Sequence, residues 1–342
     1  MHKKLETQKL NFSVSKILTQ IQLAKDRGYM KKFITFMLVI AVVVMFYLFK
    51  LEDNKNTEMK ESNDYVSPNI DIIEEKTERD TTDYTSSHIY MIDRKTGNVV
   101  HEKNAKEKAY PASLTKIMTA IVALEHINDL SETAPIDIDT YKKMVARNSS
   151  MAGFFGREKV TYRDLLYGTI LSSGGEAANS LAVHIAGNVD SFVQMMNDKA
   201  DEIGLNDTHF TNPEGLHNED QYTTAFDMAK LLDYALDNGH FKAIFTKKTF
   251  LTTSTAEHPD GILLESSVLK FLNKEEQNGF EIIGGKSGTT SEAGQCWATL
   301  GLVSDHEYIC IVMGAPLKDI RNPDRAQIAD TLKLYTKAKS NI

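Results

Sequence analysis

Three regions of the chain differ in how apolar and polar residues alternate. Residues 33–49 form an unbroken apolar run, FITFMLVIAVVVMFYLF, without a charged residue. Residues 51–86 carry eleven acidic and four basic residues among many Asn, Ser and Thr, with no lasting apolar period. From residue 87 onward, apolar residues recur at the spacings of strands and helices. We therefore predict a membrane anchor over 33–50, a disordered acidic linker over 51–86 and a globular domain over 87–342.

Charges around the apolar run predict its orientation in a membrane. The run is 17 residues long, at the short end for a membrane-spanning helix. Residues 1–32 hold eight Lys or Arg residues and two acidic residues, so the positive-inside rule places them in the cytoplasm and the domain outside. A cleaved signal peptide is the alternative, although no A-x-A-like site follows the run. Met30, followed by two lysines, is a second candidate for the start of translation.

Within the domain, strand patterns at both ends enclose a helical middle. Alternation predicts strands, the first two joined in a hairpin, at 88–93, 99–102, 279–286, 295–303 and 307–313. Helical spacing predicts a helix-rich region over roughly 113–240, for example with helices at 117–126, 162–171, 176–186 and 192–203, and a further helix at 325–339. The simplest packing is an α/β structure of the α+β type, with one antiparallel sheet built from both ends, flanking helices and a mainly helical inserted lobe. A ligand cleft is expected where the lobe meets the sheet.

Charge and cysteine content narrow the classes of partner. The 342 residues have a formal net charge of -8 and no long basic run, which argues against nucleic acid. Cys296 and Cys310 lie in separate apolar segments without metal-site spacing. We expect buried strand cysteines, with a disulfide left open as the alternative. Neither a metal nor another cofactor is indicated.

The first candidate for chemistry is the pair Ser113 and Lys116, in the sequence YPASLTK. Pro111 stands where it can open a helix, so Ser113 would lie in the first turn and Lys116 one turn on, on the same face. A serine needs an adjacent base to act as a nucleophile. A lysine can be that base when burial or a second cation lowers its pKa. Taken alone, however, this short pattern is more often an ordinary helix start with a surface lysine.

Two further segments could contribute to the same cleft. Lys286, Ser287 and Thr289 end an apolar strand in the sequence KSGTT, where a cation and hydroxyls suit a terminal carboxylate. The segment LSSGGEAAN around Ser173 reads as a helix end, a glycine turn and a new helix start. Each segment alone is a common turn or connector.

Together the three segments are far more specific. Motifs of the types S-x-x-K, S-D-N and K-T-G occur in this order in penicillin-binding proteins and class A β-lactamases. Here they are 60 and 113 residues apart, counted from Ser113 to Ser173 and from Ser173 to Lys286. The chain resembles the low-molecular-weight D-alanyl-D-alanine carboxypeptidases, a family of penicillin-binding proteins, over roughly 88–335. Further segments carry the likeness at 93–97, 102–105, 110–120, 160–168, 209–217 and 222–225.

The resemblance implies a role for each motif in an acyl-enzyme reaction. Ser113 would attack the carbonyl between the two terminal D-alanines, Lys116 would take its proton, and Ser173 would relay a proton to the leaving amine. Lys286 would bind the terminal carboxylate, with Ser287 and Thr289 beside it. Main-chain N–H groups of Ser113 and Thr289 would form the oxyanion hole.

The same resemblance implies the partners of the protein. The substrate would be a peptidoglycan stem peptide ending in D-Ala-D-Ala, and water would release the shortened peptide. β-Lactams mimic that dipeptide and would acylate the same serine. Loss of the terminal D-alanine serves either ordinary wall metabolism or glycopeptide resistance, and the sequence leaves both open.

One position departs from the family pattern and keeps alternatives open. Gly175 stands where the second motif usually ends in Asn, so an amide expected to contact substrate and Lys116 is missing. Asn179, one helical turn later, is a doubtful replacement. The alternatives are a non-catalytic sensor of muropeptides or β-lactams, and a β-lactamase, for which no Glu-x-x-Leu-Asn pattern is found. His217 is more simply a loop residue at the cleft rim than a catalytic base.

Overall fold

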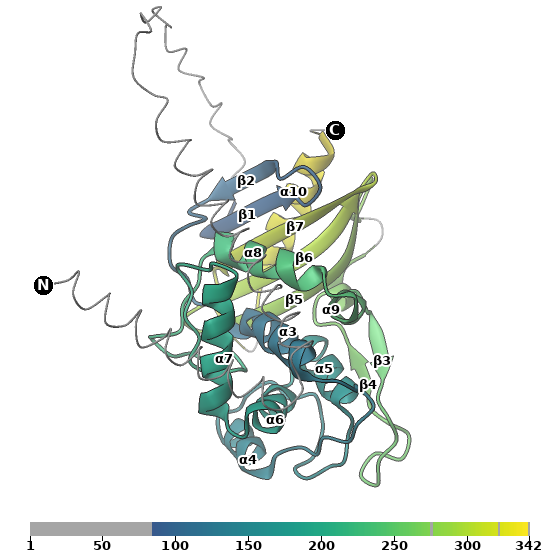
Figure 1. The fold of residues 1–342 in the computed structure, drawn as a ribbon. Coiled ribbons are helices and arrows are strands. Elements are labelled where there is room, and N and C mark those ends of the chain that lie inside the picture. Colours follow the sequence, from purple (N-terminus) through teal and green to yellow (C-terminus); the bar gives the residue numbers. More distant parts are fainter. Residues whose placement is uncertain (1–83, 274–275, 321, 341–342) are drawn as a thin grey trace, which may run out of the picture. The chain divides into compact units, whose positions relative to one another are not determined.

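A computed structural model describes residues 84–273, 276–320 and 322–340 (Figure 1). The chain divides into two units, residues 1–79 and 80–342, and all described residues belong to the second. The predicted cytoplasmic segment, the anchor and most of the linker lie outside the described residues. Within the described ranges, no helix combines the length and the apolar character that crossing a membrane requires.

A five-stranded antiparallel sheet joins the two ends of the domain, in the order β2-β1-β7-β6-β5. Its strands are β1 (His88–Asp93), β2 (Val99–Lys103), β5 (Glu281–Thr290), β6 (Gly294–Val303) and β7 (His306–Ala315). The N-terminal hairpin is attached to the three C-terminal strands by the pairing of β1 with β7. The predicted antiparallel sheet is therefore confirmed. A second sheet of two strands is formed by β3 (Thr249–Leu251) and β4 (Leu263–Glu265).

Helices fill the middle of the chain and its C-terminal end, as predicted. They are η1 (Ala112–Thr115), α3 (Lys116–His126), α4 (Ile138–Ala146), α5 (Tyr162–Ile170), α6 (Gly175–Ala186), α7 (Val189–Glu202), α8 (Ala225–Leu236), α9 (Gly239–Phe245), η2 (Leu269–Phe271) and α10 (Ala326–Ser340). Helices α4 and α8 lie within the predicted helix-rich region of residues 113–240, although no individual range was predicted for them or for α9. Side-chain caps mark the starts of the first two, because Asp137 accepts from Thr140 N and Thr224 accepts from Asp227 N.

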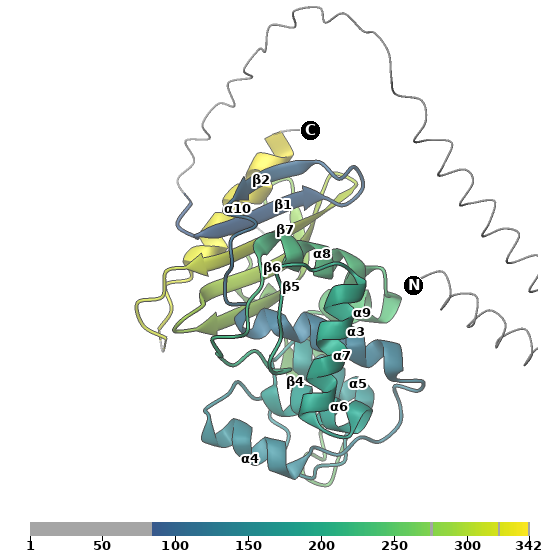
Figure 2. The same cartoon turned by 60° about the vertical axis from the view of Figure 1, so that its left-hand side comes forward.

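The two faces of the sheet are covered by different elements (Figures 1 and 2). Helix α10 packs against one face, and α8 with the helical lobe covers the other. Strand β7 shows the alternation that this requires. Tyr308, Cys310 and Val312 belong to the cluster with α10, whereas Ile309, Ile311 and Met313 belong to the cluster with the lobe.

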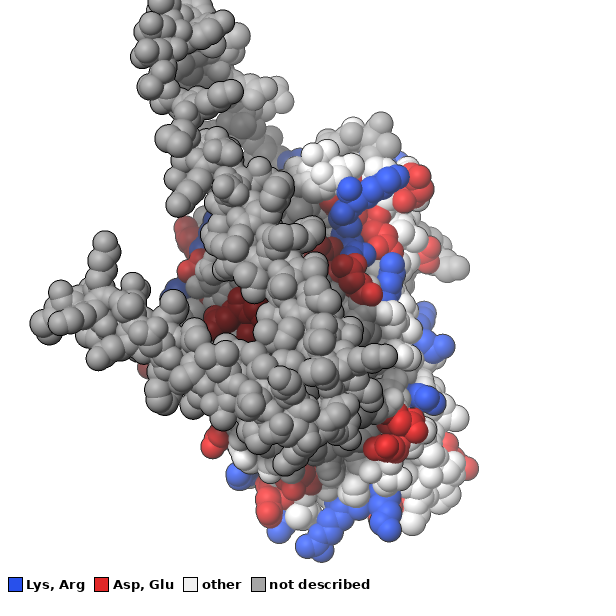
Figure 3. Space-filling model, viewed as in Figure 1, with Lys and Arg blue, Asp and Glu red and all other residues white. Residues whose placement is uncertain are grey.

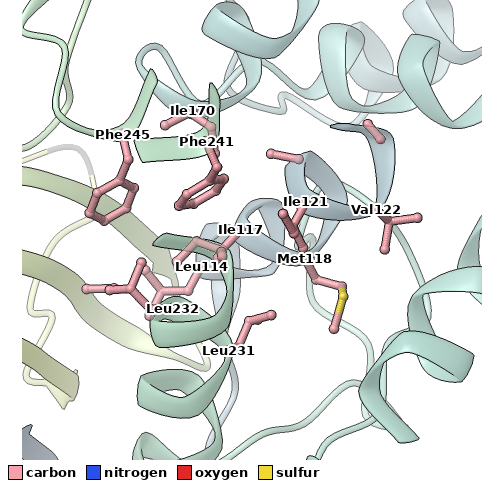
Figure 4. Close-up of a cluster of buried hydrophobic side chains, with 14 of the residues drawn as sticks. Leu114, Ile117, Met118, Ile121, Val122, Ile170, Leu231, Leu232, Phe241 and Phe245 are labelled. Atoms are coloured by element: carbon pink, nitrogen blue, oxygen red, sulfur yellow. The ribbon is translucent and has the colours of Figure 1, made fainter. Parts of the chain in front are cut away.

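Helix α3 forms the centre of the lobe (Figure 4). Its side chains Ile117, Met118, Ile121 and Val122 are buried and recur at helical spacing. They contact apolar side chains of α5, α8 and α9, including Ile170, Leu231, Leu232, Phe241 and Phe245. Every residue from 116 to 124 on α3 is buried, so the helix holds the segment at its N-terminus in a fixed position.

The folded domain begins earlier than the predicted boundary between residues 86 and 87. Tyr84 is buried in the cluster with α10, and Ser86 is fully buried. The Asp330 carboxylate on α10 accepts hydrogen bonds from Thr85 N and Oγ1 and from Ser86 N and Oγ, the last at 2.6 Å. Composition placed residues 84–86 in the polar linker because Thr and Ser look solvated. Their partner lies some 245 positions away, and local composition cannot reveal it.

Charged side chains of both signs are interspersed on the described surface in Figure 3. One group links the sheet to a helix, because Arg94 pairs with Asp233 and Asp237 on or beside α8 and with Glu307 on β7. Such partly exposed pairs contribute little stability individually. Cys296 and Cys310 are free, buried thiols on β6 and β7, as the apolar context predicted.

Candidate active site

Ser113 and Lys116 meet at the start of α3. The predicted first turn is a 3₁₀ turn, η1, which carries Ser113 and continues into α3 at Lys116. The Lys116 amine lies 3.1 Å from Ser113 Oγ and donates a second, short hydrogen bond to the main-chain carbonyl of Glu214. Lys116 is only 1% exposed. The structure therefore excludes the surface-lysine interpretation of this motif.

Two glycines allow neighbouring segments to approach the main chain at Ser113. A Cβ atom on Gly288 of β5 would lie 2.9 Å from Ser113 N, and one on Gly215 would collide with the carbonyl of Ala112. Ala112 itself has a φ of +46°, a conformation that costs a non-glycine residue about 1–3 kcal/mol. Strand β5 and the loop around Gly215 thus hold Ser113 in a strained turn from two sides.

Lys286 and Ser173 form a second buried pair. The Lys286 amine donates to Ser173 Oγ at 2.8 Å and to the carbonyl of Ser287 at 2.7 Å. Ser173 lies between α5 and α6 with a φ of +60°, in the left-handed region that few non-glycine residues adopt. Ser173 and Lys286 are 113 positions apart in the chain, and the packing of the lobe on the sheet brings them together.

Burial governs the electrostatics of the two amines. Burial lowers the pKa of Lys116 to about 8, while Glu214 and, less strongly, Glu176 oppose that shift. Burial also holds the pKa of Lys286 well below its ordinary value, and the nearby Lys116 charge lowers it further. An amine with a pKa near neutral pH is partly unprotonated there, which is the state that a general base requires.

Ser113 and Thr289 face a cavity of about 590 Å³ between the lobe and the sheet. Arg147, Glu214 and His217 also line it. The pair Lys116 and Lys286, with Ser173, lies buried beside it. Ser287 does not line the cavity, since its hydroxyl bonds Ser267 Oγ at 2.8 Å. The structure thus brings five of the six predicted site residues to one place and turns the Ser287 hydroxyl toward Ser267.

The structure shows the surroundings of His217 and Gly175. The His217 ring packs edge-on against Tyr110 with 4.7 Å between ring centroids, as expected for a residue of the rim. Gly175 is the first residue of α6, and a Cβ there would collide with Ser149 Oγ and lie 3.1 Å from Met144 Sδ. An asparagine at this position therefore requires Ser149 to move.

Sequence reasoning did not identify Glu214 as a site residue and doubted Asn179. Both residues are buried, and Asn179 Nδ2 donates to Glu214 Oε2 at 3.0 Å. The signal for Glu214 was a carboxylate in an otherwise uncharged Asn-Pro-Glu-Gly-Leu turn. The main-chain carbonyl of Glu214 in this turn accepts a hydrogen bond from the Lys116 amine.

Comparison with known proteins gives the family. The profile of the D-alanyl-D-alanine carboxypeptidases, peptidase family S11, matches residues 74–317. The chain belongs to this family. Membership predicted from the three motifs is thereby confirmed.

Named relatives agree with the profile. D-alanyl-D-alanine carboxypeptidase DacF of Bacillus subtilis is 31% identical over 242 residues, which are 70% of this chain and 59% of the relative. DacC of Escherichia coli is 34% identical over 249 residues, 70% of this chain and 58% of the relative. The chain thus spans less than two thirds of the length of these curated family members.

A solved structure matches over almost its whole length. The DD-transpeptidase of Streptomyces K15 superimposes with a TM-score of 0.66 at 28% identity, covering 75% of this chain and 98% of that protein. The sheet and lobe described above are therefore the fold of this family.

Proposed function

We propose that the protein is a serine D,D-carboxypeptidase that removes the terminal D-alanine from peptidoglycan stem peptides ending in D-Ala-D-Ala. The observation that carries this proposal is the 3.1 Å contact between a buried Lys116 amine and Ser113 Oγ at the wall of a cavity. Family membership supports the reaction type, because the relatives are named for this substrate.

Acylation begins with Ser113 and Lys116. The neutral Lys116 amine accepts the Ser113 proton as Oγ attacks the carbonyl between the D-alanines, which reverses the direction of the observed hydrogen bond. The negative oxygen of the tetrahedral intermediate is stabilised by main-chain N–H groups of Ser113 and Thr289. The close approach of Gly288 to Ser113 N supports a shared oxyanion hole.

Collapse of the intermediate requires a proton for the departing D-alanine amine. Ser173 relays it: its hydroxyl passes to this amine the proton that Lys116 took from Ser113, and the Lys286 amine, 2.8 Å from Ser173 Oγ, orients the hydroxyl. Thr289 on the cavity wall and the Lys286 charge behind it bind the terminal carboxylate. A bound carboxylate favours the protonated form of Lys286, opposing the effect of its burial.

Water then attacks the ester carbonyl and restores Ser113. The amino-group acceptor of a transpeptidase would instead form a new peptide bond, and the Streptomyces K15 structure is named for that activity. β-Lactams, as mimics of the dipeptide, acylate Ser113 and block the site. Among the residues that the structure describes around the cavity, none favours the sensor or the β-lactamase alternative over carboxypeptidase activity.

Two measurements on the same preparation test the proposal. Labelling with a fluorescent penicillin reports acylation, and release of D-alanine from a stem pentapeptide, with and without glycine as acceptor, reports turnover. We expect both signals in the wild type and neither in Ser113→Ala. Labelling without D-alanine release would indicate the sensor, and rapid hydrolysis of penicillin would indicate the β-lactamase.

We propose in addition that residues 33–50 anchor the protein in the bacterial cell membrane with the catalytic domain on the outer side. The eight basic and two acidic residues before the apolar run support this orientation. Protease added to intact spheroplasts should then remove the domain. A protected domain, or a secreted form that lacks residues 1–50, would contradict the proposal.

A further inference from the structure

Glu214 contacts the candidate catalytic pair in two ways. Its main-chain carbonyl accepts the short hydrogen bond from the Lys116 amine and lies 3.5 Å from Ser113 Oγ. Its side chain turns toward α6 and α4 instead of toward solvent, and only 2% of it is exposed. One residue thus links the amine to two helices of the lobe.

Asn179 holds the carboxylate of Glu214. Its amide nitrogen donates to Glu214 Oε2 at 3.0 Å and to the main-chain carbonyl of Gly175 at 2.9 Å. Asn179 lies on the second turn of α6. Gly175, at the start of the same helix, contributes no side chain to this part of the site. A buried carboxylate needs such donors, because an ion without them is costly to remove from water.

The charges around Lys116 come from four elements. Glu214 from the loop before Gly215 and Glu176 from α6 are negative, whereas Lys286 from β5 is the opposing cation. Arg147, after the end of α4, lies 3.9 Å from the other oxygen of Glu214, but its side chain is 53% exposed and is screened by solvent. Glu176 is engaged elsewhere, since its Oε1 accepts from the N–H groups of Ala152 and Gly153 at 2.7 and 3.0 Å.

We propose that Glu214 is a positioning residue for the reaction: its carbonyl orients the Lys116 amine, and its carboxylate, held by Asn179, places a buried negative charge beside this amine. This inference rests on the proposed function, in which Lys116 is the base. Glu214 would then act on the reaction through Lys116.

The expected effect of this charge has a definite sign. A negative neighbour favours protonated Lys116 and raises the pH at which the amine becomes a base. Its removal must shift the rise in acylation rate toward lower pH. This direction agrees with the opposing contributions of burial and Glu214 to the pKa of Lys116.

Glu214→Gln isolates the charge, because the main-chain carbonyl remains and the new side-chain oxygen can still accept from Asn179. We expect the acid limb of penicillin acylation to move to lower pH and the rate at pH 6.5 to rise severalfold. Glu158→Gln is the matched control. Glu158 is also buried, but its carboxylate bonds Thr255, His258 and Phe155 N, away from the cavity. The acid limb of acylation in Glu158→Gln should therefore coincide with that of the wild type.

A double-mutant cycle tests the role of Asn179. Asn179→Ala should move the acid limb of acylation toward lower pH in the wild-type background, because loss of the donor disfavours the charged Glu214 carboxylate, and should move it much less in Glu214→Gln. Equal shifts in both backgrounds would mean that Asn179 does not act through Glu214. Thermal unfolding of each variant separates these effects from loss of the fold.

The outcomes also separate this inference from the proposed function. Absence of acylation and turnover in the wild type refutes the function. The Lys116 titration can still be measured directly by NMR on protein labelled with ¹⁵N-lysine, assigned by comparison with Lys116→Ala. An unchanged Lys116 titration in folded Glu214→Gln would overturn the inference, whatever the turnover shows.

Discussion

The two faces of the sheet bury different chemistry. Against α10, the interior is mainly apolar and aromatic, with side chains such as Leu334 and Tyr335, whose hydroxyl is paired with Thr299 Oγ1 at 3.1 Å. Its buried carboxylate, Asp330, is fully paired with residues 85 and 86. Against the lobe, the protein buries the amines of Lys116 and Lys286 and the carboxylate of Glu214. Burial of charge is costly unless each group has partners. The face against α10 therefore contributes mainly to stability. The face against the lobe gives up some stability to hold the charged groups of the site.

This contrast predicts which property each face controls. Substitutions on the lobe side should change acylation and its pH dependence more than the free energy of unfolding. Substitutions on the α10 side should do the reverse. The following variants test that separation in order of expected effect.

Lys116→Ala should have the largest effect. Removal of a general base costs about 10²–10⁴-fold in rate, so acylation by a β-lactam should fall by that order. In the wild type, the rate should rise as pH increases through about 8, because the amine must lose its proton to act. Stopped-flow measurement of acylation across pH gives both the loss of rate in Lys116→Ala and the pH dependence of the wild type. Near wild-type rates in Lys116→Ala would rule out the lysine as the base.

Leu334→Ala should reduce stability without altering chemistry. Leu334 is fully buried on the α10 side, and truncation of such a leucine costs about 2–5 kcal/mol. Denaturant unfolding should show this loss, while the acid limb of acylation stays at the wild-type pH. A displaced limb would mean that the two faces are coupled through the sheet.

Asp330→Ala should have a smaller effect on stability. Its carboxylate holds residues 85 and 86 through four hydrogen bonds, and loss of a buried acceptor leaves donors unpaired at a cost of about 1–3 kcal/mol. Removal of residues 51–83 should leave stability and acylation unchanged, whereas removal of 51–86 should cost at least as much as Asp330→Ala, because it also removes the buried Tyr84. Comparable stability of the two deletions would show that the Asp330 contacts contribute nothing.

Gly175→Asn should have the smallest effect. The new side chain must displace Ser149, whose hydroxyl is otherwise in the path of its Cβ. We expect a severalfold change in acylation rate with activity retained, and partial recovery in the double variant with Ser149→Gly. Complete loss of activity with an intact fold would show that the start of α6 tolerates only glycine.

The sequence alone determined the elements and the first half of the site. Strand and helix positions follow from short-range periodicity, so the hairpin, the three late strands and most helices could be located before the structure was known. Ser113 and Lys116 are three positions apart at a helix start, and local geometry brings them together in either a 3₁₀ or an α-helical turn. Resemblance to a family added Ser173, Lys286 and Thr289, which local patterns alone did not distinguish from connectors.

Tertiary structure decided the environment of those residues. The contact of Lys116 with the Glu214 carbonyl spans 98 positions, and that of Lys286 with Ser173 spans 113, so no local pattern encodes either. The docking of residues 84–86 on α10, the turn of Ser287 toward Ser267 and the fit of Gly175 against Ser149 depend likewise on distant neighbours. A sequence states which groups can carry charge, but packing sets how far they are removed from water and what they face. Those two quantities determine whether Lys116 can act as a base.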